Sequence, residues 1–391
     1  MRFLSPSHLA RKSRTLQKAV RTAGVLLGLF LMAAGWQGYA AASPAAPAPG
    51  PIPGGTPTPA GMLASPPPAA SLPPAAAGTG PAAAPATPDP ASAASIPLPS
   101  GSAPGISYVP YISDTCQYLR DRWDPGGSQP GTVVVPVMFH SILKSGRDVP
   151  PGDHTSVTEA AFDAFMQHAH SLGFQTITAG QLVNFLYNNE KIPRLSLILI
   201  IDDRRPGTVR TSFLPFLKQF GWTVTMAYIT GVPEPPEWME VQQLFATGLV
   251  DVQVHGFLHN GQTYFTDQTP EETILREIYA PIPVIREHFG YDPVAFIWPG
   301  GDFTAHTVEV AQQAHYRIGF TVFARGPLLF NAIPQGAEEK AVGQPLMLLP
   351  RYWSPSDYYS VDEALRISQS ASSGAEKNKA AEQAWLEKNC R

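Results

Sequence analysis

Apolar and polar positions follow two alternating patterns along residues 133–349, and this alternation predicts strands that take turns with helices. Short, continuously apolar runs are typical of strands buried on both faces. Between them, apolar residues recur three or four positions apart, as on one face of a helix. The order favours an α/β fold built on a parallel sheet or barrel. The runs that predict strands are 133–139, 174–177, 195–201, 223–229, 249–254, 294–298, 318–323 and 346–349.

Several helix starts are indicated by polar residues at characteristic spacings. The segments 156–159 and 269–272 each have a Ser or Thr followed three positions later by Glu, which predicts a capping box. Thr178 stands where an N-cap would begin another helix. After Ser370 the chain is rich in Ala, Glu and Lys, and we expect a loose helix that leads to Cys390.

The first 42 residues have the layout of a secretory signal. Residues 1–22 are basic and contain no acid, residues 23–36 are apolar, and Ala40–Ala42 offers a small-residue cleavage site. This predicts an exported protein, periplasmic or extracellular, that loses residues 1–42. If cleavage fails, the apolar run could instead serve as a membrane anchor, so both outcomes remain open.

Residues 43–105 are rich in Ala and Pro and carry almost no charge, which predicts a disordered linker. The remaining residues, 106–391, have the size of a single α/β barrel domain. The net charge of −4 gives no basic surface and argues against nucleic acid as a partner. Cys116 and Cys390 lie near the two ends of this domain; they could form a disulfide in an exported protein or remain two separate thiols.

Polar residues follow several predicted strands, where the carboxyl ends of parallel strands converge on one site. An aspartate together with two histidines spaced i, i+4 would give three ligands and an open position, the pattern of a catalytic metal that is most often zinc. Taken singly, each histidine could equally be a structural residue. These strand-end residues are His140, Asp202, Asp203, His255, Asp302 and Arg351, with His259 one helical turn after His255.

Taken together, these segments resemble the polysaccharide deacetylase family (NodB homology, carbohydrate esterase family four). The counterparts of its Asp-Asp-Gly, H-[S/T]-x-x-H and R-x-P-x-G motifs are Ile201–Arg204, His255–His259 and Phe296–Gly301. Met138–His140 and Leu349–Arg351 are similar to the exported branch that acts on poly-β-1,6-N-acetylglucosamine in biofilm. The resemblance covers residues 133–353. It implies a distorted (β/α)7-type barrel and metal-dependent hydrolysis of N-acetyl groups on a polysaccharide.

The resemblance also implies roles for individual residues. Asp202 would be the general base. The family's late histidine acid has no counterpart after His315, and by resemblance to the branch with an early Met-x-His strand, His140 would be the general acid. A buried structural role for His140 is the alternative. A divalent ion, with zinc as the expected metal, would be held by Asp203, His255 and His259. Contacts to the substrate would come from Trp298, Pro299, Gly300 and Arg351, and Arg351 could also orient Asp202.

Three departures from the family motifs leave the activity open. Arg204 stands in place of a glycine, Gly256 in place of a hydroxyl residue, and Trp298 where the family often has arginine. One alternative is therefore a glycan-binding descendant of the same fold without catalysis. A second is a deacetylase of chitin oligomers or peptidoglycan.

Overall fold

The computed structural model describes residues 106–259, 264–354 and 357–390. The expected signal peptide (1–42) and linker (43–105) lie outside these residues. Within the described ranges, no helix combines the length and the apolar character that crossing a membrane requires.

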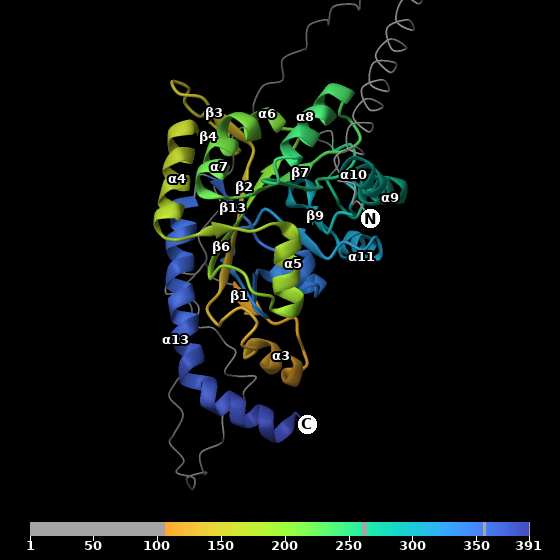
Figure 1. Cartoon of the computed structure of the whole chain (residues 1–391). Coiled ribbons are helices and arrows are strands. Elements are labelled where there is room, and N and C mark those ends of the chain that lie inside the picture. Colours follow the sequence, from red (N-terminus) through yellow and green to blue (C-terminus); the bar gives the residue numbers. More distant parts are fainter. Residues whose placement is uncertain (1–105, 260–263, 355–356, 391) are drawn as a thin grey trace, which may run out of the picture. The chain divides into compact units, whose positions relative to one another are not determined.

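A curled, mainly parallel sheet forms the centre of the domain (Figure 1). Its strand order is β10-β9-β8-β7-β6-β2-β11, with β5 also paired to β6 and β13 to β2. All neighbours run parallel except β11, which is antiparallel to β2. The strands are β2 (Val133–Phe139), β5 (Gln175–Thr176), β6 (Leu195–Asp202), β7 (Val224–Tyr228), β8 (Val250–Val254), β9 (Ala295–Ile297), β10 (Ile318–Phe320), β11 (Leu328–Leu329) and β13 (Tyr352–Trp353).

One short stretch, Leu349–Trp353, closes this sheet into a barrel, and we name it the closing segment. At its start, Leu349 bridges to Phe320 of β10 in parallel. At its end, β13 pairs in parallel with β2. The closing segment therefore stands between the two edges as the seventh member of the ring, after β2, β6, β7, β8, β9 and β10. This confirms the expected distorted (β/α)7-type barrel.

The apolar runs are explained by burial on both faces of the sheet. In β6, Leu197 and Leu199 belong to the cluster that packs against helices such as α4 (Glu159–Ser171). The alternate residues Ile198 and Ile200 belong to a second cluster, which includes residues of α5 (Ala179–Asn188). Successive side chains point to opposite faces of a strand, so both faces must be apolar here.

Helices connect the strands and cover the barrel. Those after α5 and before the C-terminal helix are α6 (Pro206–Thr208), a π-helix (Val209–Phe213), α7 (Leu214–Phe220), α8 (Pro235–Phe245), α9 (Glu271–Tyr279), α10 (Pro281–Phe289), α11 (Ala305–Gln313) and α12 (Ala337–Val342). Single-turn 3₁₀ helices lie at Pro299–Gly301 and Pro345–Met347. Two small sheets pair β1 (Ser107–Val109) with β12 (Ile333–Gln335) and β3 (Ser141–Leu143) with β4 (Ser156–Thr158).

Both predicted capping boxes are wrong, because neither Ser156 nor Thr269 is the N-cap of the helix that follows it. Ser156 lies in β4, and the next helix starts at Glu159 with Thr158 as its N-cap. Thr269 precedes Pro270, which is itself the N-cap and provides no side-chain acceptor. After it the chain forms two consecutive helices, α9 and α10, because Pro281 begins a new helix.

The predicted strand 346–349 is also largely wrong. A 3₁₀ turn occupies Pro345–Met347, and only Leu349 contacts β10 as a strand residue would. The region between 324 and 345, for which no strand was expected, contains β11 and β12.

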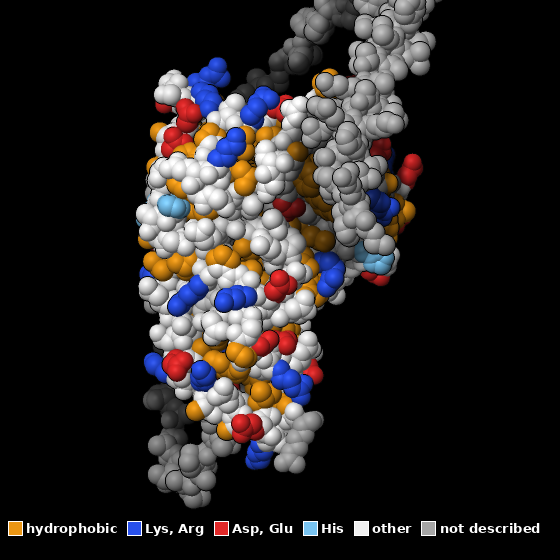
Figure 2. Space-filling view, in the orientation of Figure 1, with side chains coloured by type: hydrophobic (Ala, Val, Ile, Leu, Met, Phe, Trp, Pro, Cys, Tyr) orange, Lys and Arg blue, Asp and Glu red, His pale blue; other side chains and the backbone are white. Residues whose placement is uncertain are grey.

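The C-terminal helix is longer than expected. It spans α13 (Asp357–Asn389) and packs beside β2, α4 and α3 (Thr115–Arg122) (Figure 1). Directly after it, Cys390 is bonded to Cys116 of α3, with the two Cα atoms 5.5 Å apart. The disulfide thus ties the end of the last helix to the start of the described domain. Acidic and basic side chains are interspersed on the face seen in Figure 2, as expected for a domain with no basic surface.

Candidate active site

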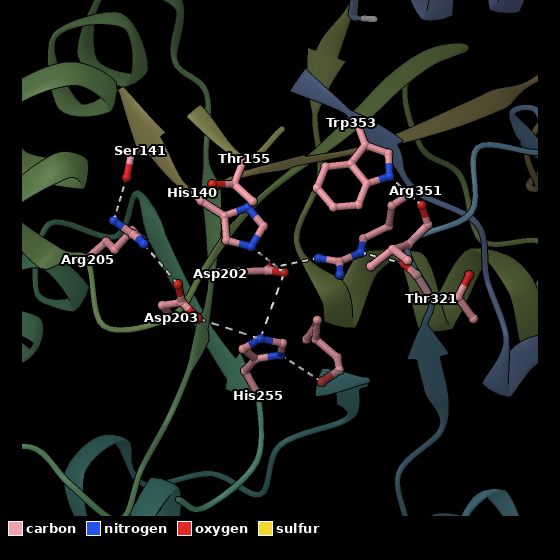
Figure 3. Close-up of polar contacts among 12 residues, drawn as sticks. His140, Ser141, Thr155, Asp202, Asp203, Arg205, His255, Thr321, Arg351 and Trp353 are labelled. Atoms are coloured by element: carbon pink, nitrogen blue, oxygen red, sulfur yellow. Dashed lines mark hydrogen bonds and ion pairs between the residues drawn. The ribbon is translucent and has the colours of Figure 1, made fainter. Parts of the chain in front are cut away.

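The two adjacent aspartates at the end of β6 face the same pocket because the chain turns sharply between them. Asp202 is the last residue of the strand, and Asp203 has a left-handed backbone conformation with φ of +70°. Without this turn, neighbouring side chains would point to opposite faces. With it, Asp202 Oδ2 lies 4.0 Å and Asp203 Oδ1 3.9 Å from Nε2 of His255 (Figure 3).

Asp202 is held by a buried arginine from the closing segment. Arg351 Nη1 donates to Asp202 Oδ1 at 2.7 Å, and Arg351 Nε donates to the carbonyl of Thr321 at 2.7 Å (Figure 3). The residues are 1% and 0% exposed. Burial by itself would raise the pKa of Asp202, but Arg351, followed by His255 and His140, outweighs it and lowers the pKa to about 2. Asp202 is therefore ionised at neutral pH. Arg351 acts on this carboxylate and does not line the pocket, so the expectation that it contacts substrate is not met.

Asp203, His255 and His259 form a cluster that fits a divalent metal ion. One potential ligand atom from each lies within 4.8 Å of the others. Nδ1 of His255 donates to the carbonyl of Ile297 at 2.9 Å, since a carbonyl can only accept, and this leaves Nε2 as the nitrogen that faces the two aspartates. Nδ1 of His259 is buried without a hydrogen-bond partner among the described residues. Burial, then His255, lowers the pKa of His259 to about 4, which favours the neutral imidazole that binds metals.

The glycine between these histidines is required by the backbone. Gly256 has φ of +80°, a conformation in which any other residue is strained. The hydroxyl residue that the family motif has at this position would not fit the turn seen here. Gly256 is therefore a consequence of how this turn is built.

The cation beside the metal cluster is Arg205, which the sequence analysis did not single out. Arg205 Nη2 donates to Asp203 Oδ2 at 3.0 Å, and Nη1 donates to the hydroxyl of Ser141 at 2.7 Å (Figure 3). Arg204 instead pairs with Glu237 of α8 at 3.2 Å. One oxygen of Asp203 is thus taken by Arg205, while Oδ1 faces His255. The sequence shows two consecutive arginines after the aspartates, but it does not show which of the two side chains turns toward Asp203.

His140 follows β2 and lies across the pocket from His255. Its Nε2 is 3.8 Å from Asp202 Oδ2, and its ring is parallel to that of Trp353 with the centroids 6.2 Å apart (Figure 3). Burial lowers the pKa of His140, and the attraction of Asp202 and Asp203 only partly opposes this. The position is the one expected for a group that exchanges protons with Asp202 or a substrate.

These side chains line an open pocket of about 640 Å³. Gly300 belongs to the lining, as predicted for a substrate contact, but Trp298 and Pro299 do not. Trp298 is 0% exposed, packs against Phe265 and Phe296, and donates its indole N–H to the carbonyl of Met347 at 2.8 Å. The prediction that Trp298 contacts the substrate is therefore wrong. The aromatic side chains that do line the pocket are those of Trp353 and Tyr264.

Residues 190–319 match the family model described as "Polysaccharide deacetylase". No protein among the curated sequences matches the chain. Solved structures with a similar fold include the Streptococcus pyogenes deacetylase PplD in complex with acetate, which is 17% identical at a TM-score of 0.46 and covers 59% of this chain and 98% of that one. IcaB from Ammonifex degensii is 17% identical, with a TM-score of 0.45 and coverage of 60% and 97%. A de-N-acetylase from Aggregatibacter actinomycetemcomitans is 14% identical, with a TM-score of 0.46 and coverage of 60% and 100%.

The matched segment begins ahead of β6 and ends in β10, so it contains Asp202, Asp203, His255 and His259 but not His140. Over these residues, about a third of the chain, the protein is similar to the polysaccharide deacetylase family.

Proposed function

We propose that this protein is a metal-dependent N-deacetylase of an N-acetylglucosamine-containing polysaccharide, with poly-β-1,6-N-acetylglucosamine as its substrate. The observation that carries the proposal is one pocket that holds both an ionised, buried carboxylate and a three-ligand cluster. Asp202 stands 4.0 Å from His255, a member of that cluster. The family match over 190–319 supports the same reaction class.

Asp203, His255 and His259 would hold the metal, and their one carboxylate and two imidazoles suit zinc. When bound, a divalent ion supplies Lewis-acid chemistry, making water more acidic and stabilising negative charge on an amide oxygen. Arg205 leaves Oδ1 of Asp203 free on the side of His255, so the aspartate keeps one oxygen for the ion.

Asp202 has the geometry of a general base. Arg351 occupies its Oδ1, so Oδ2, on the side of His140 and His255, is the oxygen available to accept a proton from the attacking water. His140 Nε2, 3.8 Å from Oδ2, is placed to receive that proton from Asp202 and to pass it to the departing amine. Water and the N-acetyl group are thereby converted into acetate and a free amine.

The sugar would lie against the aromatic lining. Trp353 and Tyr264 border the pocket, so they would make the substrate contact that was expected of Trp298. Their flat rings can pack against the apolar faces of sugar units. Because the pocket is open, a residue within a long polymer can enter it. We also propose that the protein is exported and that residues 43–105 act as a tether. These residues lie outside the described ranges.

The test is acetate release from a partly N-acetylated glucosamine polymer, together with the metal content of the purified protein. We expect release that depends on zinc and falls by about 10²–10⁴ in Asp202→Asn and in His140→Ala, both still binding metal. Asp302→Asn is the control, since Asp302 also follows a strand but is exposed and outside the pocket lining.

The proposal fails if the folded protein takes up no metal, or if Asp202→Asn releases acetate as fast as wild type. Binding of the polymer without any acetate release would instead identify a glycan-binding protein of the same fold.

A further inference from the structure

The turn from His255 to His259 is bonded to a buried carboxylate, in addition to its backbone bonds to residues 228–231. Glu277 of α9 is 0% exposed. Its Oε2 accepts three backbone N–H bonds in succession, from Phe257 at 2.8 Å, Leu258 at 2.9 Å and His259 at 3.3 Å. These three residues lead up to and include His259, the second histidine of the cluster. The carboxylate therefore fixes the path of the chain that joins the two imidazoles.

The same oxygen explains the glycine at position 256. A Cβ atom built on Gly256 would lie 2.9 Å from Glu277 Oε2, closer than side-chain carbons approach such atoms. The φ of +80° at Gly256 turns the following N–H groups toward Glu277. Glu277 and Gly256 are therefore complementary: the carboxylate takes the place beside the turn that a side chain at position 256 would need.

We infer that Glu277 is a positioning residue for the metal site. This inference rests on the proposed function, because it presumes that His255 and His259 bind a metal. Three backbone N–H groups converge on one fully buried oxygen, so the turn cannot change its path without breaking these hydrogen bonds. They hold His259 at a fixed distance from His255 before any metal arrives, and such partners behind the ligands typically affect metal affinity 10–100-fold.

Zinc affinity, measured by competition with a chromogenic chelator, tests the inference. We expect Glu277→Ala to bind zinc about 10–100-fold more weakly than wild type. Glu277→Gln should stay close to wild-type affinity, because its amide oxygen can still accept the N–H bonds. Glu339→Ala is the matched control: Glu339 is also fully buried, but it bonds Arg325 and the backbone N–H of Gly336 and makes no bond to the turn from His255 to His259, so zinc affinity should not change.

Hydrogen exchange in the metal-free protein gives a second readout that does not depend on metal. The amides of residues 257–259 should exchange faster in Glu277→Ala than in wild type and should keep their protection in Glu339→Ala. If Glu277→Ala does not fold, Glu277→Asp serves instead: it keeps the charge but is one methylene too short to reach the turn, so the same losses are expected.

Folded Glu277→Ala or Glu277→Asp with wild-type zinc affinity, or with unchanged exchange at residues 257–259, would overturn the inference. This result is distinct from failure of the proposed function, in which wild type itself binds no zinc.

Discussion

Replacing Arg351 by methionine would leave Asp202 as a buried carboxylate without its guanidinium partner. Methionine fills a similar volume with an unbranched, uncharged chain, so the change removes charge with little loss of packing. The pKa of about 2 at Asp202, against an ordinary value of 3.8, corresponds to about 2.5 kcal/mol in favour of the ionised form. Removing one partner of a buried pair typically costs about 3–5 kcal/mol, because the other charge stays in a poorly solvated place. We therefore expect Arg351→Met to lower the free energy of unfolding by about 3–5 kcal/mol at pH 7.

The assay is denaturant unfolding of metal-free protein in a double-mutant cycle. Asp202→Asn should also destabilise the protein, since it leaves the guanidinium of Arg351 buried with a neutral partner. The double variant removes both charges, and its loss should be smaller than the sum of the single losses by about 2–3 kcal/mol. Arg351→Lys should fall between wild type and Arg351→Met, because an ammonium group cannot make the bonds to Asp202 and to Thr321 with the planar geometry of arginine.

Two results would refute this reasoning. An unchanged unfolding midpoint in Arg351→Met would mean that the charge of Asp202 is solvated in spite of its burial. Additive losses in the cycle would mean that the 2.7 Å contact between the two side chains contributes nothing beyond their separate surroundings.

Three further changes have defined outcomes. Gly256→Ala should destabilise the protein and weaken zinc binding. Its control is Gly290→Ala, at a nearly identical φ of +81° but with nothing within 4 Å of the added Cβ, which should cost only about 1 kcal/mol of backbone strain. Equal losses of unfolding free energy in the two variants would contradict the predicted clash at Gly256. Reducing the disulfide between Cys116 and Cys390 should lower the free energy of unfolding by about 2–5 kcal/mol in scans with and without dithiothreitol, and the double Cys→Ser variant should show no such response. Trp353→Ala should raise KM about tenfold and change kcat less, as loss of a substrate contact predicts; an effect on kcat alone would argue against that role.

The apolar pattern was sufficient to predict a parallel sheet or barrel because the strands are buried on both faces, and the choice of a barrel came from the family resemblance. The run into Asp202 has no polar residue from Leu197 to Ile201, and only a strand covered on both sides requires that. Regions where the spacing of a polar residue is compatible with either a helix cap or a strand were predicted poorly. Ser156 has the spacing of a helix cap, yet pairing of β4 with β3 takes that residue into a strand.

The residues of the candidate site divide in the same way. Asp203, His255 and His259 could be found because they follow strands, and strand ends in such a barrel meet at one mouth. Trp298 also follows a strand, but its ring turns into the core, and the sequence alone does not show which way a side chain turns. Glu277 was out of reach for another reason: it acts through backbone N–H groups 18 to 20 residues away, and those bonds depend on how α9 packs against the turn.

The closing segment also sets an order of events during synthesis. Arg351 lies 149 residues beyond Asp202, which at ribosomal rates corresponds to a delay of about 7–30 s. During that interval Asp202 is without its arginine. Once β10 has been made, its outer edge and the part of β2 that pairs with β13 stay unpaired until the closing segment follows. Unpaired strand edges are the parts of a protein most prone to join other chains. Translation that stalls before residue 349 would therefore release chains that aggregate. Once residues 349–353 have been added, the ring can close, and Arg351 pairs with the charged carboxylate of Asp202 in the same step.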